Sequence, residues 1–105
     1  MTAFRLERDG DERECTVAVE SDLLAKVVPD LKMALACELA AGVLEVRFDL
    51  PHTQRLDPSA LGLLLALANS LEAAHGRVEV WRVQPKLLKV FHRLGLAERL
   101  NVRGA

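Results

Sequence analysis

The sequence predicts an α/β protein in which a small mixed β-sheet carries its helices on one face. Two observations predict this arrangement. Stretches with strand and helix patterns follow one another in the order β-β-α-β-α-β-α. The clearest strand, VLEVRFDL at 43–50, alternates apolar and polar side chains, so one face of the sheet is expected to contact water. With 105 residues the chain has the size of one domain, and we expect a single domain over 1–105.

The first half of the chain predicts a hairpin followed by a helix. Phe4–Glu7 and Cys15–Val19 have strand character, and Asp9-Gly10-Asp11 between them is a hairpin turn signal. The segment 21–28 is compatible with a loop or with a short helical turn. Pro29 suits a first helical position, and apolar residues then recur at helical spacing until Gly42.

The second half, after the central strand, predicts two more helices and one more strand. The expected elements are a loop, a helix, a strand, a helix and a final turn, at 51–56, 57–75, 77–83, 85–94 and 96–100. Gly76 and Gly95 are expected to end the two helices. Asp57 is the expected N-cap of the longer helix, with its side chain bonded to a first-turn N–H, and Pro58 is its first helical residue.

The longer helix has an unusual outer side. One half of its helical wheel carries leucines and alanine that would face the core, at 61, 63, 64, 67, 68 and 71. The other half carries mostly small side chains in place of Lys, Glu and Arg: Ser59, Gly62, Ala66, Asn69, Ser70 and Ala73, with Leu65 and Glu72 near its edges.

This smooth side predicts contact with another polypeptide, which a second copy of the chain would also satisfy. The alternative is that a second layer of the same chain buries it, although a chain of 105 residues has little left to do so. Gly62 favours the contact interpretation. Glycine inside a helix costs about 1 kcal/mol relative to alanine, so some contact is expected to require its small size.

Composition excludes several other classes of protein. Fourteen basic and fifteen acidic residues give a net charge of −1 without a block of either sign, which argues against nucleic acid or an anionic membrane as the main partner. The longest apolar stretch is shorter than the roughly 20 residues of a membrane span, and the N-terminus does not resemble a secretory signal. Cys15 and Cys37 do not form a CxxC pair, so we expect reduced thiols and a cytoplasmic protein.

Catalytic and ligand-binding motifs are lacking as well. His52, His75 and His92 show neither HxxxH nor HExxH spacing, so no metal site is expected. Ser59 lacks the GxSxG setting of a hydrolase, and no glycine-rich phosphate loop follows a strand. We therefore expect no cofactor and no enzymatic activity. Trp81, on the polar side of its strand, is either an exposed anchor for a partner or an aromatic covered at the sheet edge.

The stretch VRFDLPHTQRLDPSALGLLLAL (46–67) resembles the centre of the STAS domain family, of the anti-sigma-factor-antagonist type. That family has a strand ending in Asp-Leu, a short loop, and Asp-Ser-Ser/Thr-Gly-Leu-Gly at the start of an apolar helix. The following HGRVEVWRVQPKLLKVFHRLGLAERLNV (75–102) is similar to the family's Gly-strand-helix-Gly-Leu tail, and the resemblance covers roughly 13–103. It implies a small mixed sheet with helices on one face.

The resemblance also implies a protein partner. In partner-switching members, a kinase that is also an anti-sigma factor phosphorylates the first Ser after the motif Asp. Asp57, Leu61 and Gly62 match the motif, but Pro58 occupies the acceptor position and Ala60 replaces a Gly. Ser59 is a possible substitute acceptor, although support of the helix start is its simpler role. Asp49 matches the Asp that ends the family's central strand, where a carboxylate on the wet face is the simpler interpretation.

We therefore expect a bacterial module that binds a partner through the Asp57 loop and the following helix. Its expected partner-binding residues are Asp57, Pro58, Ser59, Gly62, Leu65, Ala66, Asn69 and Ser70. One hypothesis is an anti-sigma-factor antagonist that regulates transcription, with Ser59 or no residue phosphorylated. The other is a constitutive subunit of a larger assembly, such as the STAS-like component of a bacterial lipid-transport ABC complex, which Pro58 favours.

Overall fold

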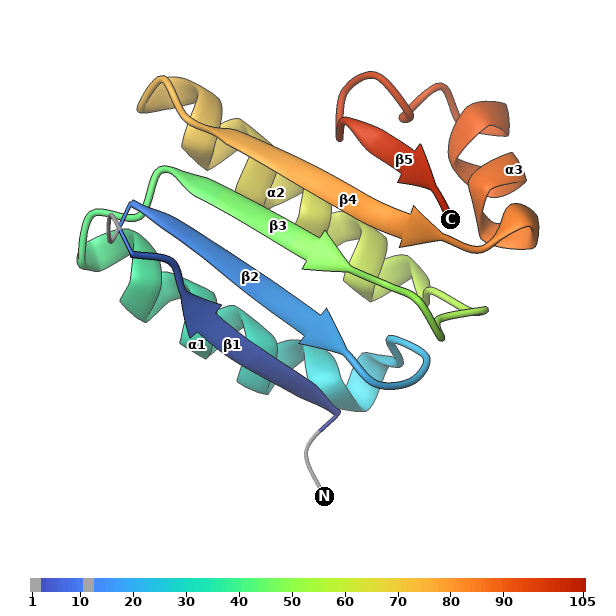
Figure 1. Cartoon of the computed structure of the whole chain (residues 1–105), viewed down its shortest axis with the longest axis horizontal. Coiled ribbons are helices and arrows are strands. Elements are labelled where there is room, and N and C mark those ends of the chain that lie inside the picture. The colour runs from blue at the N-terminus through green and yellow to red at the C-terminus, as the bar shows by residue number, and fades with distance from the viewer. Residues whose placement is uncertain (1–2, 11–12) are drawn as a thin grey trace.

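The computed structural model describes residues 3–10 and 13–105, and its five strands form one sheet in the spatial order β1-β2-β3-β4-β5 (Figure 1). The strands are β1 (Phe4–Arg8), β2 (Glu14–Val19), β3 (Glu45–Asp49), β4 (Arg77–Val83) and β5 (Val102–Gly104). β1 is antiparallel to β2, and the remaining neighbours are parallel. The sheet is therefore mixed, as predicted.

The helices pack behind this sheet. They are the short 3-10 helix η1 (Ala25–Val27), α1 (Val28–Ala40), α2 (Pro58–Ala73) and α3 (Pro85–Arg93). In Figure 1 α1 and α2 lie on the far side of the sheet, α3 lies beside β5 at its edge, and the near side is uncovered. This confirms the prediction of helices on one face.

The alternation of side chains along the strands explains this one-sided packing. The inward positions of the three central strands are apolar and almost completely buried: Cys15, Val17, Val19, Val46, Phe48, Val78 and Val80. They pack against leucines of the helices, such as Leu31 and Leu35 of α1 and Leu64 and Leu71 of α2. Most outward positions of these strands carry charged side chains, so burying them under a second helical layer would be costly.

Several predicted boundaries shift by one or two residues. α2 ends at Ala73 instead of His75, and α1 begins at Val28, which makes Pro29 its second residue. The segment 21–28, for which the sequence allowed either a loop or a short helical turn, contains η1. Gly42 and Gly95 adopt the positive φ expected after a helix. The hairpin turn at Asp9-Gly10-Asp11 lies partly outside the described residues.

β5 is the element that the sequence did not predict. The turn after α3 ends at Asn101, which has a φ of 51°, and its Nδ2 donates a hydrogen bond to the carbonyl oxygen of Val78. This contact places Val102–Gly104 beside β4, where Ala105 N–H also donates to Val83 O. The three-residue strand covers the edge of β4.

The two cysteines differ in environment. Cys15 is 1% exposed on the inward face of β2, and burial raises the pKa of its thiol to about 11, with nearby Glu38 and Asp9 adding to the rise. Cys37 is exposed on α1. Both are free thiols in the structure, as expected.

Candidate functional site

The loop before α2 is fixed by hydrogen bonds to the segment before η1. The Thr53 side chain is fully buried, and its Oγ1 donates to the carbonyl oxygen of Ser21 at 2.8 Å. Leu23 N–H donates to Arg55 O, and Asp57 N–H donates to Leu23 O, so the two segments pair like short parallel strands. The loop is therefore a rigid support for the start of α2.

Asp22 makes the second attachment of this loop. Its Oδ1 accepts hydrogen bonds from the N–H groups of Gln54 and Arg55, at 2.8 and 3.0 Å. These two bonds, and the positive charge of Arg55, hold the pKa of the Asp22 carboxyl below its ordinary value. Neither Asp22 nor Thr53 was recognised from the sequence, because a single polar residue in a loop carries no periodic signal.

Asp57 occupies the N-cap position of α2 as predicted, but the predicted side-chain bond is wrong. The carboxylate makes no capping bond to α2, and its Oδ2 accepts the N–H of Ala25 at the start of η1, at 2.7 Å. The backbone carbonyl of Asp57 accepts the N–H groups of Ala60 and Leu61. The motif aspartate therefore ties α2 to η1.

The outer side of α2 is exposed. Of the predicted partner-binding residues, Pro58, Ser59, Gly62, Ala66, Asn69 and Ser70 are exposed, and Asp57 and Leu65 are half-buried. The alternative that the same chain buries this face is therefore wrong. The core side consists of Ala60, Leu64, Leu67, Ala68 and Leu71, while Leu61 and Leu63 are half-buried at its margins. Ala60, which replaces a family glycine, is 1% exposed and packs in the core.

Gly62 has no role in the packing of this chain. A Cβ built on it meets no atom within 4 Å, and its φ is not positive. Neither a close approach within the fold nor a backbone conformation therefore explains a glycine here. Because Gly62 has no side chain, nothing projects from the outer surface of α2 at this position.

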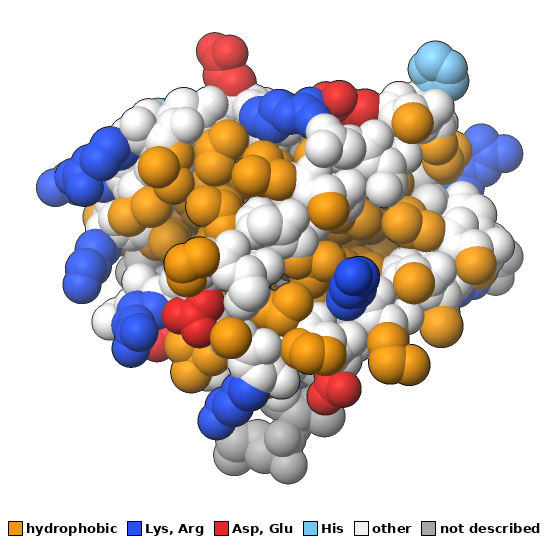
Figure 2. Space-filling model, turned by 180° about the vertical axis from the view of Figure 1, so that it is seen from behind, with side chains coloured by type: hydrophobic (Ala, Val, Ile, Leu, Met, Phe, Trp, Pro, Cys, Tyr) orange, Lys and Arg blue, Asp and Glu red, His pale blue; other side chains and the backbone are white. Residues whose placement is uncertain are grey.

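A groove runs along α2 on the side of α1. One hollow of about 170 Å³ is lined by Leu35, Ala36 and Leu39 of α1 and by Leu63, Ala66, Leu67 and Ser70 of α2, with Lys32 at its edge. A second of about 210 Å³ is lined by Val28 and Lys32 of α1 and by Ser59, Gly62, Leu63 and Ala66 of α2. Because they share Lys32, Leu63 and Ala66, we treat them together as the α1–α2 groove. Figure 2 shows hydrophobic side chains gathered over this helical side and a hollow near its middle.

The other flank of α2 differs from the groove. Arg99, in the turn after α3, donates through Nη2 to Asn69 Oδ1 and through Nη1 to Glu72 Oε1. Asn69 is thus exposed but already bonded within the chain. The predicted surface divides into a groove side, with Gly62, Ala66 and Ser70, and a second side, with Leu65 and Asn69. The contributions of α1 and Arg99 could not be read from the helical pattern of α2.

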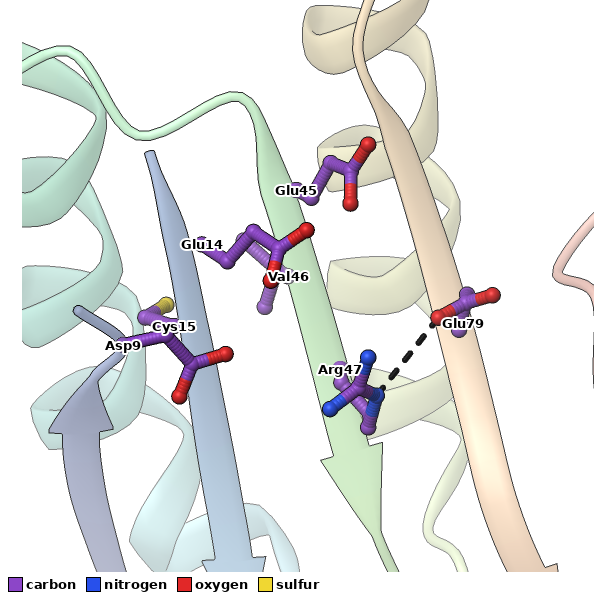
Figure 3. Close-up of a pocket in the computed structure, with 7 residues that line it drawn as sticks. All are labelled: Asp9, Glu14, Cys15, Glu45, Val46, Arg47 and Glu79. Atoms are coloured by element: carbon purple, nitrogen blue, oxygen red, sulfur yellow. Dashed lines mark ion pairs between the residues drawn. The ribbon is translucent and has the colours of Figure 1, made fainter. Parts of the chain in front are cut away.

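The open face of the sheet carries a second group of polar side chains around a small hollow. At the start of β2 and β3 a hollow is lined by Asp9, Glu14, Glu45, Arg47 and Glu79, with Cys15 and Val46 behind (Figure 3). It has no room for a water-sized ligand. On the same face Asp49 forms an ion pair with Arg82 at 2.5 Å, which confirms its interpretation as a wet-face carboxylate.

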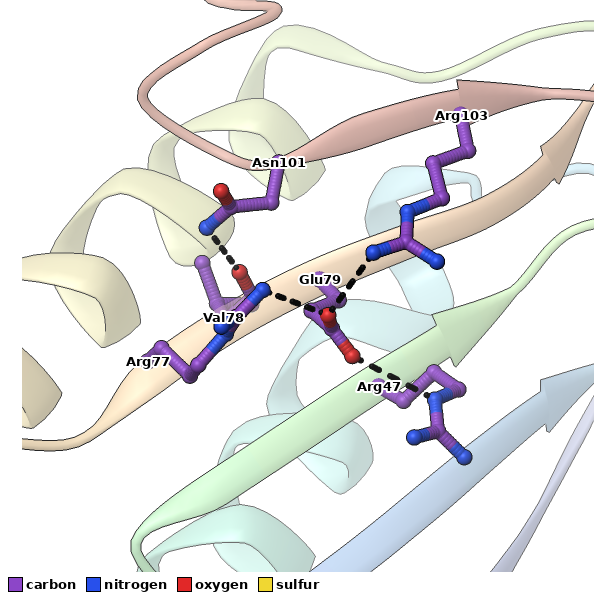
Figure 4. A network of polar contacts seen from close by, with 6 residues as sticks. All are labelled: Arg47, Arg77, Val78, Glu79, Asn101 and Arg103. Atoms are coloured by element: carbon purple, nitrogen blue, oxygen red, sulfur yellow. Dashed lines mark hydrogen bonds and ion pairs between the residues drawn. The ribbon is translucent and has the colours of Figure 1, made fainter.

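Trp81 lies on this open face between two arginines. The guanidinium carbons of Arg47 and Arg103 are 3.9 and 5.3 Å from its ring centroid, a cation–π arrangement. The Glu79 carboxylate beside it is paired with Arg47, Arg77 and Arg103 (Figure 4). Trp81 is half-buried and covered by Arg103 of β5, which supports the covered-aromatic alternative.

The described residues contain no candidate metal site and no candidate membrane span. Within 3–10 and 13–105, no three His, Cys, Asp or Glu side chains are placed to hold a metal ion. In the same residues, none of the helices combines the length and the apolar character needed to cross a bilayer.

Comparison with known proteins places nearly the whole chain in one family. Residues 6–103 match the family model described as "Mlab, STAS domain". No curated protein sequence matches the chain in a direct search.

Solved structures share the fold at low sequence identity. The anti-sigma factor antagonist SpoIIAA, a Bacillus cell fate determinant, is 23% identical in its unphosphorylated form, with a TM-score of 0.85 over 98% of this chain and 88% of that one. A Thermotoga maritima protein described as a putative anti-sigma factor antagonist is 16% identical, with a TM-score of 0.86 over 97% and 86%. An anti-sigma factor antagonist from Mycobacterium paratuberculosis is 20% identical, with a TM-score of 0.79 over 97% and 85%.

Proposed function

Because the chain belongs to the STAS domain family, we propose that it is a non-enzymatic module that binds a protein partner through the Asp57 loop and the outer side of α2. The observation that carries this proposal is the α1–α2 groove with Gly62 on its floor. Gly62 lowers the propensity of α2 to form a helix and meets nothing inside the chain. A residue that costs stability without serving the fold is best explained by a backbone or side chain that comes close from outside.

Two versions of this function differ in what happens at the start of α2. The solved relatives are described as anti-sigma factor antagonists, one of them in unphosphorylated and phosphorylated forms, which supports a regulator in the bacterial cytoplasm. Ser59 is exposed in the first turn of α2, where the helix dipole would tolerate a phosphate. Pro58 has no hydroxyl, which supports a constitutive subunit, such as the STAS-like component of a lipid-transport ABC complex.

A neutral, bulky substitution tests the contact surface. We expect Ala66→Trp to fill the α1–α2 groove and to abolish capture of the native partner from the source cell, while the circular dichroism spectrum stays unchanged. The matched control is Ala74→Trp, which adds the same bulk at an exposed position just beyond α2. Equal capture by both variants would rule out this surface.

Phosphorylation separates the two versions. The protein is incubated with its captured partner and ATP, and its intact mass is measured beside that of Ser59→Ala. A phosphate present on the wild type and absent from Ser59→Ala supports the switching regulator. If no phosphate is added and the partner is a transporter subunit, the constitutive version holds.

A further inference from the structure

Lysines and arginines of the molecule differ in their pairing. Most arginines form ion pairs within the chain, on the open sheet face (Arg5, Arg47, Arg77, Arg82 and Arg103) and toward the helices (Arg8 with Glu38 of α1, Arg99 with Glu72 of α2). All four lysines lie on the helical side and are exposed, at Lys26, Lys32, Lys86 and Lys89. In the described part of the chain none of them, nor Arg93, has a carboxylate within ion-pair distance.

Two of these unpaired cations, Lys26 and Lys32, lie beside the predicted partner surface. Lys32 stands at the edge of both hollows of the α1–α2 groove. Lys26 belongs to η1, which the Asp57 carboxylate ties to the start of α2. Lys86, Lys89 and Arg93 recur at helical spacing and form one stripe of α3, which packs against β5. Figure 2 shows Lys and Arg side chains around the margin of the apolar area.

Most carboxylates of this side have partners within the chain, and Asp30 of α1 is exposed. Glu38 and Glu72 pair with Arg8 and Arg99, and the carboxylates of Asp22 and Asp57 accept backbone N–H groups. Among the described residues that line the two hollows, Lys32 is the only charged one, and Lys26 lies nearby on η1, so a partner that covers the groove would meet cations and no carboxylate in the lining. Desolvating them costs free energy unless the partner supplies negative charge.

We propose that the partner docks on this surface with an acidic amphipathic helix, whose apolar side lies in the α1–α2 groove and whose carboxylates face Lys26 and Lys32. This inference rests on the proposed function and adds the chemistry of the partner. A helix fits because small residues at 59, 62, 66, 70 and 73 follow one side of α2 and let a second backbone approach along it.

An anionic membrane surface is the other partner that lysines would attract, and the apolar side chains argue against it. Leu87 and Phe91, the largest apolar residues of α3, are 3% and 1% exposed in the core. Val90 and Leu94 are exposed beside the basic stripe, at 39% and 52%, and Met33 is exposed on α1, at 71%. Three such side chains on two separate helices give little area to insert among lipids, whereas the groove between α1 and α2 suits a helix.

Titration of the ¹⁵N-labelled full chain with three probes tests the proposal. The first is a synthetic amphipathic helix with Leu and Ala on one side and Glu on the other, the second has Lys in place of Glu, and the third is phosphatidylglycerol vesicles. We expect the Glu peptide alone to shift the amide signals of Gly62, Ala66 and Ser70. Lys32→Glu should weaken its binding about tenfold, with a Kd that depends less on salt.

Arg5→Glu is the matched control, because it changes the net charge equally on the open sheet face, where the Arg5 side chain is 64% exposed. Equal effects of Lys32→Glu and Arg5→Glu, equal binding of the Lys peptide, or the same shifts caused by vesicles would overturn the inference. Loss of partner capture in Ala66→Trp but not in Lys32→Glu would leave the proposed function standing and reject only the acidic partner. No effect of Ala66→Trp would reject both.

Discussion

Among single residues, Gly76 shows a constraint that differs from the one its position in the sequence suggests. It was expected to end the helix, but the residue with the left-handed conformation at this helix end is His75, with a φ of 63°. Gly76 is required for another reason. Its N–H donates to Leu71 O at 2.6 Å, and a Cβ placed on it would lie 2.0 Å from the carbonyl oxygen of Leu44. The glycine lets the start of β4 pass the backbone before β3.

Gly76→Ala is expected to destabilise the protein by about 3 kcal/mol, because the obstacle is backbone that cannot rotate away. Urea denaturation measures the loss. Gly10→Ala is the control, since a Cβ at Gly10 meets no atom within 4 Å, and it should leave the midpoint almost unchanged. A midpoint for Gly76→Ala equal to that of the control would contradict the close approach to Leu44.

Asp22 predicts how the loop before α2 responds to acid. The pKa of its carboxyl in the folded protein is lower than the ordinary value of 3.8, because the N–H groups of Gln54 and Arg55 favour the ionised form. This stabilisation is complete above the unfolded pKa and is lost as pH falls through the folded one. As pH falls below the ordinary pKa of 3.8, the free energy of unfolding of the wild type should therefore fall more steeply than that of Asp22→Asn. Parallel curves would show that Asp22 does not bind these groups.

At the scale of whole elements, α2 shows what the sequence predicts well and what it cannot. Its exposed outer side follows from the 3.6-residue period alone, and so do its core leucines. The partners of that side depend on tertiary contacts between distant segments. The Asp57 bond to Ala25, the groove wall formed by α1 and the Arg99 bond to Asn69 leave no local pattern. β5 was missed for a related reason, because three residues are too few to show alternation.

Gly62→Ala tests whether α2 has a reduced helix stability for the sake of contact with a partner. Alanine favours the helix by about 1 kcal/mol, and its Cβ meets no atom of the chain. We expect the melting temperature to rise by about 4 °C, which differential scanning calorimetry measures. An unchanged or lower melting temperature would mean that the fold itself requires the glycine.

At the scale of the whole molecule, the two faces of the sheet differ in what covers them. Parallel strands usually have helices on both sides, yet here three parallel pairs leave one side in water. Charged side chains keep that side soluble and connect the strands. Glu79 of β4 links Arg47 of β3 with Arg103 of β5, and Trp81 fills the space between the two guanidiniums.

Glu79→Gln should reveal how much this network contributes. The substitution keeps the shape of the side chain but leaves three arginines close together without their anion, so we expect a loss of about 1 kcal/mol. The deficit should shrink when thermal unfolding is repeated in high salt, which screens the repulsion among the arginines. Glu7→Gln, at the exposed end of the Arg5 pair, is the control and should have little effect.

Because the two cysteines differ in exposure, the native sequence can be labelled at a single thiol for spectroscopy. At pH 8 a maleimide dye should attach to Cys37 alone, because Cys15 is buried and protonated. Cys37 directly follows Ala36, which lines the α1–α2 groove. Without any substitution, a fluorophore at this thiol would report by its emission or anisotropy when another molecule settles between the two helices.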